Sequence, residues 1–403
     1  MWEQIRSNQR RSIILAIAMG LVLLGLGYAL GFYFADNGAA GIIFALALWI
    51  IMNLVAFFQG DNILLALSGA RKIGPNDHPR LYNIVEEMQI AAGLKKMPDV
   101  YIIDDQALNA FAVGRDQDKA AVAVTSGLLS RLNRDELQGV IAHEMAHIKN
   151  RDVLLMAFTS VMLGTIVMLS WYASRMMIFG GSSSSRRDSK GGAAQGIIML
   201  IAILLVILAP IFAQLIYFAI SRKREYLADA SGASFTRYPE GLASALEKIS
   251  SSTEQLKTAN QATAPMFIIN PFRQKGKAAA NLSSTHPPTS ERIRILRAMG
   301  GASFADYNKA YSEVQGKGHG ILPASALAAT PRVPIRQTPR KMAAAPEDGA
   351  NELQRTRETS DVLWKMNNYT TVNCPCGTRL RIPPDFKDPS VQCPHCNRII
   401  SFT

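Results

Sequence analysis

Two histidines and a glutamate in the pentapeptide His-Glu-Met-Ala-His, residues 143–147, are the side chains of this sequence best suited to catalysis. Positions four apart share one face of a helix, so His143 and His147 could bind one metal ion while Glu144 reaches a bound water. A chance register of buried histidines is the alternative, disfavoured because the 403 residues include only 6 histidines. The spacing therefore predicts a zinc hydrolase.

The flanking sequence indicates that this pentapeptide lies on a helix. Asn133 is expected to be the N-cap, and Glu136 occupies the position that completes a capping box. Nothing breaks the helical pattern before Asn150. An apolar stripe runs through the histidines and consists of Leu137, Val140, Ile141 and Ile148.

A catalytic zinc ion needs one more protein ligand, because such sites use three protein groups and keep one position open. The best candidates are Glu225 and Asp229, which are again four residues apart in the segment Arg-Glu-Tyr-Leu-Ala-Asp. One carboxylate could bind the metal while the other accepts a hydrogen bond from a ligand histidine. The alternative is a solvated charged patch at the end of a membrane segment.

The two motifs, with the apolar hairpin between them, resemble the HtpX-like membrane metalloproteases, relatives of the CAAX prenyl endopeptidases. The resemblance covers about residues 1 to 300. It implies that His143, His147 and Glu225 bind a catalytic zinc ion and that Glu144 is the general base and acid. It also implies that Asp229 is an outer partner of one ligand histidine.

Two further segments match this family. One resembles its substrate-binding edge strand and consists of Asn109, Ala110, Phe111 and Ala112. Free backbone groups on such a strand could pair with an extended peptide, although an ordinary buried strand is the structural alternative. The other resembles a later His-Pro and Arg element, Thr285-His286-Pro287 and Glu291-Arg292-Ile293. His286 could approach the metal or the oxyanion, or only order its loop.

The apolar residues, 48% of the chain, are concentrated in blocks. Residues 12–35 and 37–60 are each long enough to cross a bilayer as a helix, and we expect them to form a transmembrane hairpin rather than a secretory signal. Residues 153–174 and 191–220 predict a second hairpin, with buried helices of a soluble core as the alternative. An even number of crossings then separates His147 from Glu225, as a shared metal ion requires.

Basic residues flank these spans on the side expected to be cytoplasmic. This distribution predicts a multi-pass protein of the cell inner (plasma) membrane with its active site and both termini in the cytoplasm. The basic loop at 175–190 disagrees, so a re-entrant second hairpin stays open. The net charge of +12 does not indicate nucleic acid, because its excess flanks spans or lies in a linker. The flanking residues are Arg6, Arg10, Arg11, Arg71, Lys72, Arg222, Lys223 and Arg224.

All the cysteines lie near the C-terminus, as Cys374, Cys376, Cys393 and Cys396. Two such knuckles predict a closed structural zinc site, because a segment this short has too little core to fold without one. Disulfides are the alternative, disfavoured in a reducing cytoplasm. His395 could replace a cysteine, and the first knuckle is tighter than usual.

These features predict a mainly α membrane protein with a zincin-type α+β metalloprotease domain, about four transmembrane helices and a small C-terminal zinc-ribbon domain. Within the protease domain, residues 78–92, 241–249 and 290–299 are expected to be helices, and 100–103 and 120–124 strands. The expected units are a first hairpin, two protease halves around a second hairpin, a linker and the ribbon: 1–60, 61–152, 153–221, 222–315, 316–369 and 370–403.

The expected function is zinc-dependent hydrolysis of peptide bonds in misfolded or damaged membrane proteins at the cytoplasmic face of the bilayer. Two Zn²⁺ ions are expected, one catalytic and one structural, and the partner of the ribbon is unknown. A prenyl-protein-type processing protease would need a chamber among more spans. A non-catalytic zinc-binding scaffold or adaptor would have no use for Glu144.

Overall fold

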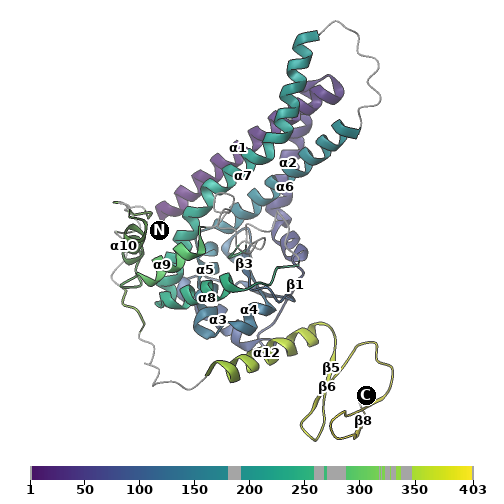
Figure 1. Cartoon of the computed structure of the whole chain (residues 1–403), viewed down its shortest axis with the longest axis vertical. Helices are drawn as coiled ribbons and strands as arrows, with labels where there is room; N and C mark the ends of the chain where they lie inside the picture. Colours follow the sequence, from purple (N-terminus) through teal and green to yellow (C-terminus); the bar gives the residue numbers. More distant parts are fainter. Residues whose placement is uncertain are drawn as a thin grey trace.

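The computed structural model describes residues 2–179, 192–257, 267–269, 287–316, 318, 320–322, 327, 333–336 and 347–401. Long helices stand as a bundle on a mixed body of helices and a small sheet (Figure 1). The C-terminal hairpins lie at the end of the body opposite this bundle (Figure 1). The three parts therefore follow one another along the long axis of the molecule.

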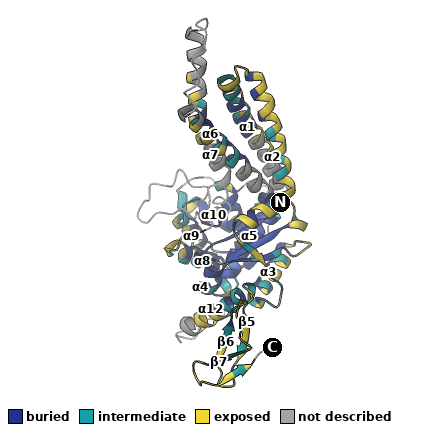
Figure 2. Ribbon diagram, turned by 90° about the vertical axis from the view of Figure 1, so that its right-hand side faces the viewer, coloured by how far each residue is buried: buried dark blue, intermediate teal, exposed yellow. Residues whose placement is uncertain are grey.

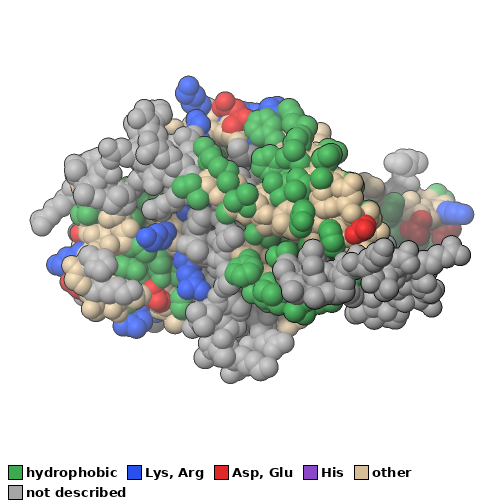
Figure 3. Space-filling view, turned by 90° about the horizontal axis from the view of Figure 1, so that it is seen from above, with side chains coloured by type: hydrophobic (Ala, Val, Ile, Leu, Met, Phe, Trp, Pro, Cys, Tyr) green, Lys and Arg blue, Asp and Glu red, His purple; other side chains and the backbone are tan. Residues whose placement is uncertain are grey.

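The bundle consists of α1 (Trp2–Ala35), α2 (Gly38–Leu67), α6 (Asp152–Phe179) and the upper part of α7 (Gly192–Thr236). Segments Ile17–Ala35 and Gly38–Val55 are long and apolar enough to cross a membrane. Large apolar side chains such as Ile43 and Phe44 are exposed at 69% and 63%. Figure 2 shows the exposed outer faces of the bundle in yellow, and Figure 3 shows apolar side chains in green gathered at the bundle end; an apolar exterior of this kind suits lipid.

Glycines allow α1 and α2 to pack with their backbones in contact. A Cβ atom added to Gly41 would lie 2.0 Å from the carbonyl oxygen of Gly27 and 2.8 Å from the Cα of Gly31. Any larger residue at Gly41 would push the two helices apart. Small residues at helix crossings are typical of membrane bundles, where close packing replaces the hydrophobic effect as the main attraction.

The sheet of the body places one strand at an edge. Its order is β1 (Ala70–Lys72), β2 (Asp99–Ile103), β4 (Ala121–Thr125) and β3 (Ala110–Val113). Strands β2 and β4 are parallel, and β3 is antiparallel to β4 with Ala110 opposite Val124. The strands predicted at 100–103 and 120–124 are confirmed to within a residue, and β3 is the edge strand expected at 110–113.

Helices surround this sheet and bury the core shown in dark blue in Figure 2. The central helix is α5 (Arg134–Lys149), which packs against α3, α7 and α8. His78 caps α3, because its Nδ1 accepts a hydrogen bond from the Leu81 N–H at 3.2 Å. The remaining elements are α3 (Pro79–Ala92), the 3₁₀ turn η1 (Gln117–Lys119), α4 (Ser126–Arg131), α8 (Pro239–Ser251), α9 (Thr289–Arg297) and α10 (Phe304–Gln315).

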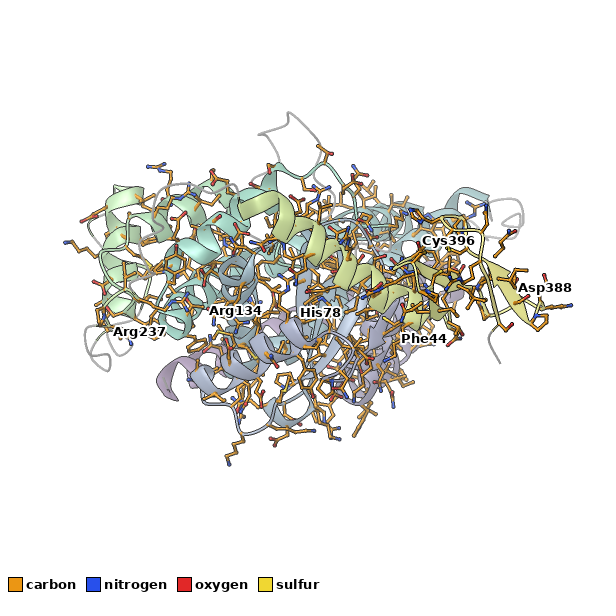
Figure 4. The ribbon with its side chains drawn as sticks, turned by 90° about the horizontal axis from the view of Figure 1, so that it is seen from below. Phe44, His78, Arg134, Arg237, Asp388 and Cys396 are labelled. Atoms are coloured by element: carbon orange, nitrogen blue, oxygen red, sulfur yellow. The ribbon has the colours of Figure 1, made fainter. Side chains whose placement is uncertain are left out.

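Helix α12 (Glu347–Met366) lies across the underside of the body and leads to the C-terminal hairpins (Figure 4). The Arg355 Nε donates to the Ser130 carbonyl of α4 at 3.1 Å, and Lys365 pairs with Asp77. At the other end, the Arg381 guanidinium lies 5.2 Å from the ring centre of Trp364. Both the protease body and the hairpins therefore contact α12. The hairpins pair β5 (Thr370–Asn373) with β6 (Arg379–Ile382) and β7 (Ser390–Gln392) with β8 (Ile399–Ser401).

Candidate metal centres

Helix α5 places two imidazoles side by side in the core of the body. The helix begins with the capping box expected from the sequence, in which Asn133 and Glu136 each bond to the other's backbone. The Nε2 atoms of His143 and His147 lie 3.2 Å apart, and the two residues are 1% and 3% exposed. Helical spacing and burial thus direct both rings to one point.

Helix α7 supplies a carboxylate at the same point. Glu225 is 2% exposed, and its carboxylate oxygens lie 3.7 Å from the His143 Nε2 and 3.5 Å from the His147 Nε2. The helix can approach α5 this closely because it carries Gly232, where an added Cβ would lie 3.2 Å from the His143 backbone nitrogen. The structure therefore brings together three side chains that are up to 82 residues apart in sequence, the interval from His143 to Glu225 (225 − 143 = 82).

The three donors fit a zinc ion. Bonds of about 2.0–2.1 Å at tetrahedral angles place neighbouring ligand atoms roughly 3.3 Å apart. The observed separations of 3.2, 3.5 and 3.7 Å match three corners of such a tetrahedron. Two imidazoles and one carboxylate are also a ligand set used by catalytic zinc, which leaves a fourth corner for water or substrate.

Each histidine also contacts an aspartate of its own through Nδ1, the ring nitrogen on the side away from Glu225. The His143 Nδ1 lies 3.0 Å from the Asp229 Oδ1, and the His147 Nδ1 lies 3.2 Å from the Asp152 Oδ2. Both aspartates are 0% exposed. Such contacts fix the tautomer of a ligand histidine, so that Nε2 presents its lone pair to the metal.

A buried arginine compensates the charge of Asp229. The Nε and Nη2 of Arg292 donate to the two oxygens of that carboxylate at 2.8 and 2.7 Å, and Arg292 is 0% exposed. Burial disfavours the ionised form of Asp229, but the charge of Arg292 and the bond to His143 outweigh it and lower the pKa of Asp229. The Arg292 Nη1 is also 3.5 Å from the Glu225 Oε2.

Glu144 is placed to exchange protons. It is 1% exposed, and burial raises its pKa to about 7, with the charges of His147 and Glu225 acting in opposite directions. The backbone N–H of Ala112 in β3 hydrogen-bonds to its carboxylate. A carboxyl group with a pKa near neutrality can both accept and return a proton, as a general base and acid must.

The expected substrate strand lies beside this centre, because Ala112 belongs to β3 and contacts Glu144 directly. The same edge of β3 holds residues 267–269 through Asn109 and Ala110. His286 lies outside the described residues. The structure describes Pro287 next to it, before α9 begins at Thr289.

The second candidate centre joins the two C-terminal hairpins. The Cys374 sulfur lies 3.2 Å from that of Cys376 and 3.5 Å from that of Cys396, and the sulfurs of Cys376 and Cys393 are 3.7 Å apart. These separations are close to the roughly 3.8 Å expected for four thiolates around zinc and far longer than a disulfide bond. Among the described residues, His395 is not part of this group.

The tight first knuckle is accommodated by a glycine. The Gly377 N–H donates to the Cys374 carbonyl at 2.8 Å, and Gly377 has a φ of +91°, a conformation that favours glycine. The chain can therefore turn sharply directly after Cys376, which keeps the Cys376 sulfur close to that of Cys374.

Sequence reasoning did not assign Asp152, Arg292 or residues 267–269 to the candidate metal centre. Asp152 lies five residues beyond His147, and it returns to that ring because Arg151 adopts a left-handed conformation with a φ of +58°. An acidic residue directly before an apolar helix was the available signal. Arg292 was noted only within a longer matching segment. Residues 267–269 carried no signal, since nothing local marks three apolar residues as partners of β3.

The fold and the cluster of His143, His147 and Glu225 indicate the class of protein: a metalloprotease whose candidate metal ligands lie on helices α5 and α7. Comparison with known proteins narrows this class. Peptidase family M48 matches residues 75–300. The chain is 45% identical over 299 residues to a "Protease HtpX homolog" from Dictyoglomus turgidum, in an alignment that covers 74% of this chain and 95% of that protein.

A "Protease HtpX homolog" from Streptococcus pneumoniae is 41% identical over 301 residues, covering 74% of this chain and 100% of that protein. The chain belongs to peptidase family M48 and is an HtpX-like membrane zinc endopeptidase. A crystal structure of S. mikatae Ste24p aligns with a TM-score of 0.40 and 20% identity, covering 73% of this chain and 67% of that one. The cysteine centre lies beyond the residues that the family matches.

Proposed function

We propose that His143, His147 and Glu225 bind one catalytic zinc ion and that Glu144 moves the protons of peptide hydrolysis. The observation that carries this proposal is the meeting of three buried ligand atoms, all within 4.8 Å of one another, beside a buried carboxyl group. Asp229 and Asp152 orient the two histidines. Arg292 keeps Asp229 ionised despite its burial.

When bound, zinc supplies Lewis acidity, which lowers the pKa of water and polarises a peptide carbonyl. Glu144 accepts a proton from the attacking water and delivers it to the departing amine. Burial raises the pKa of Glu144, which makes its carboxylate a stronger proton acceptor. The Ala112 N–H holds the carboxylate in place during both transfers.

Substrates are proposed to bind as an extended strand along β3. Ala110 and Ala112 direct backbone groups to the edge that faces Glu144, and Asn109 adds a side-chain amide there. Recognition of main-chain groups depends little on sequence, which suits an enzyme that acts on many damaged proteins. Phe111 provides an aromatic surface at the same strand.

The four bundle helices are proposed to cross the bilayer, with the protease body and both termini in the cytoplasm of the cell membrane. Their apolar exteriors and the basic residues after α2 and within α7 support this orientation. The substrates would then be misfolded or damaged membrane proteins and their cytoplasmic loops. The cysteine centre is proposed to bind a second, structural zinc ion in a ribbon that recruits a partner.

The decisive experiment compares the full chain with its Glu144→Gln variant in detergent. We expect equal zinc content and a loss of casein cleavage by the variant of at least a thousandfold, because both protons pass through this carboxylate. Asp135→Asn, on the same helix with its side chain 40% exposed, is the matched control. Retained cleavage by Glu144→Gln would remove Glu144 from the mechanism. Absence of cleavage by the parent chain would favour the scaffold, and cleavage of prenylated peptides alone would favour the processing protease.

A further inference from the structure

The outer edge of β3 is occupied by a segment of the same chain. The Ile268 N–H donates to the Ala110 carbonyl at 3.1 Å, and the Asn109 side-chain amide donates to the Ile269 carbonyl at 3.1 Å. The Thr125 N–H of β4 donates to the Asn109 carbonyl, so Asn109 faces β4 and Ala110 faces away from it. Residues 267–269 therefore lie on the edge that β4 leaves free.

This edge is the one that faces the catalytic centre. Ala112 has the same orientation as Ala110, and its N–H bonds to Glu144. The Ile268 carbonyl accepts a hydrogen bond from the Arg292 Nη1 at 3.2 Å, and this nitrogen lies 3.5 Å from the Glu225 carboxylate. The peptide unit of Ile268 is thus held between the edge strand and the side chains around the metal ligands.

The side chains of this segment are apolar and buried. Phe267 and Ile268 are each 1% exposed and Ile269 is 4% exposed. The Phe267 ring meets the Phe111 ring of β3 edge to face, with centres 5.1 Å apart. The surfaces around the edge therefore bury large apolar side chains at three successive positions of a bent segment.

We propose that residues 267–269 are an internal occupant of the peptide-binding edge, which a substrate displaces before it is cleaved. The proposal rests on the assignment of β3 as the substrate strand. The incoming peptide takes over the hydrogen bonds to Ala110, Asn109 and Arg292 that the segment makes. Displacement would expose these apolar surfaces to water unless the peptide buries them again, so the substrate class is a peptide with bulky apolar residues at these positions.

This exchange explains how a broadly specific protease can spare folded proteins. An extended apolar stretch is exposed in a damaged protein and buried in an intact one. Only the former can compete with a segment that is already covalently attached and therefore present at high effective concentration. A peptide must therefore bind the edge of β3 more strongly than the internal segment does, which requires apolar side chains.

The test measures peptide binding without cleavage. The probe is a fluorescein-labelled peptide with the sequence of residues 264–272, Ala-Pro-Met-Phe-Ile-Ile-Asn-Pro-Phe, and the protein is the full chain carrying Glu144→Gln. Adding Ile268→Pro removes the N–H that bonds to Ala110. Since one such bond contributes on the order of a factor of five, we expect the probe to bind about fivefold more tightly.

Ile335→Pro is the matched control, because Ile335 also lies in described backbone without regular secondary structure, is 37% exposed and makes no hydrogen bond to β3 among the described residues. It should leave probe affinity unchanged. A probe with Asp in place of the central Ile should bind at least tenfold more weakly to every variant. Phe267→Ala, which removes the ring contact with Phe111, should also tighten binding if Ile268→Pro lowers the melting temperature too far for measurement.

Weaker probe binding by both Ile268→Pro and Phe267→Ala would overturn the proposal, because the segment would then be a permanent strand that builds the site. Unchanged binding by both would overturn it as well. These outcomes are separate from a failure of the proposed function, which would appear as a parent chain that contains zinc but cleaves no casein. Binding by the protein that carries Glu144→Gln does not depend on cleavage, so each idea can fail alone.

Discussion

Removing the charge behind His147 should weaken zinc binding by a predictable amount. Asp152 is 0% exposed and lies 3.2 Å from the His147 Nδ1. A hydrogen bond to an ionised acceptor contributes about 1.5–3 kcal/mol and a neutral one about 0.5–1.5 kcal/mol. Asp152→Asn keeps an acceptor but loses the charge, so we expect a cost of about 1–1.5 kcal/mol, or roughly tenfold in zinc affinity. Asp152→Ala leaves the imidazole N–H buried without this partner and should cost about a hundredfold.

The assay is competition for zinc against a chelating dye, using the full chain in detergent with Glu144→Gln present to stop self-cleavage. Replacing zinc with Co²⁺ distinguishes the two centres by their absorbance, because only the cysteine centre gives a thiolate-to-metal charge-transfer band. Asp135→Asn is again the control, since it lies 12 residues before His147 on the same helix (147 − 135 = 12). If Asp152→Ala binds zinc within a factor of two of the parent, Asp152 does not orient His147 and the reasoning fails.

Three other perturbations have definite expected results. Arg292→Met leaves Asp229 buried without its cation and should destabilise the metal-free fold by about 3–5 kcal/mol. Adding Asp229→Asn should recover part of the lost melting temperature. Equal melting temperatures for the parent and Arg292→Met would contradict the pairing. Burial lowers the pKa of His78 to about 4 from 6.5, so its stabilising contribution is complete above pH 6.5 and is lost as the pH falls toward 4. At pH 5 the loss should be about 2 kcal/mol, and His78→Asn, which keeps an N-cap without a titrating ring, should show a smaller drop in unfolding temperature between pH 7 and pH 5. Cys393→Ser should reduce bound zinc from two ions to one per chain and leave casein cleavage unchanged; a loss of cleavage would tie the ribbon to catalysis.

Local sequence patterns predicted much of the catalytic helix. Asn133 and Glu136 mark its start through a capping box, and the spacing of its histidines depends only on helical geometry. Glu225 was identified by its motif, although its approach to α5 depends on Gly232, whose role emerges only when two helices pack. Local patterns thus sufficed wherever the interacting residues lie within a few turns of one helix.

Contacts between distant segments could not be predicted in the same way. Asp152 reaches His147 because Arg151 adopts a left-handed backbone conformation, and no periodic sequence pattern predicts such a turn. Ile268 pairs with Ala110 across more than 150 residues of sequence, and any extended apolar segment has the same local pattern. The placement of α12 on α4 also joins distant segments, through contacts such as that of Arg355 with Ser130.

Helix α7 connects the helical bundle to the candidate metal centre. This helix runs from Gly192 in the bundle to Thr236 in the body, contains Pro210 in the part that belongs to the bundle, and carries Glu225 at its lower end. A helix transmits displacement along its axis where each turn is hydrogen-bonded to the next, and in α7 this holds for the part below Pro210, which has no N–H to donate. Movement of α7 against α1 or α6 would therefore shift Glu225 relative to the histidines of α5, which belong to a different rigid element. The separations of 3.5 and 3.7 Å between the Glu225 oxygens and the two Nε2 atoms leave little tolerance for such a shift, so the packing of the bundle helps to set the geometry of this candidate metal site.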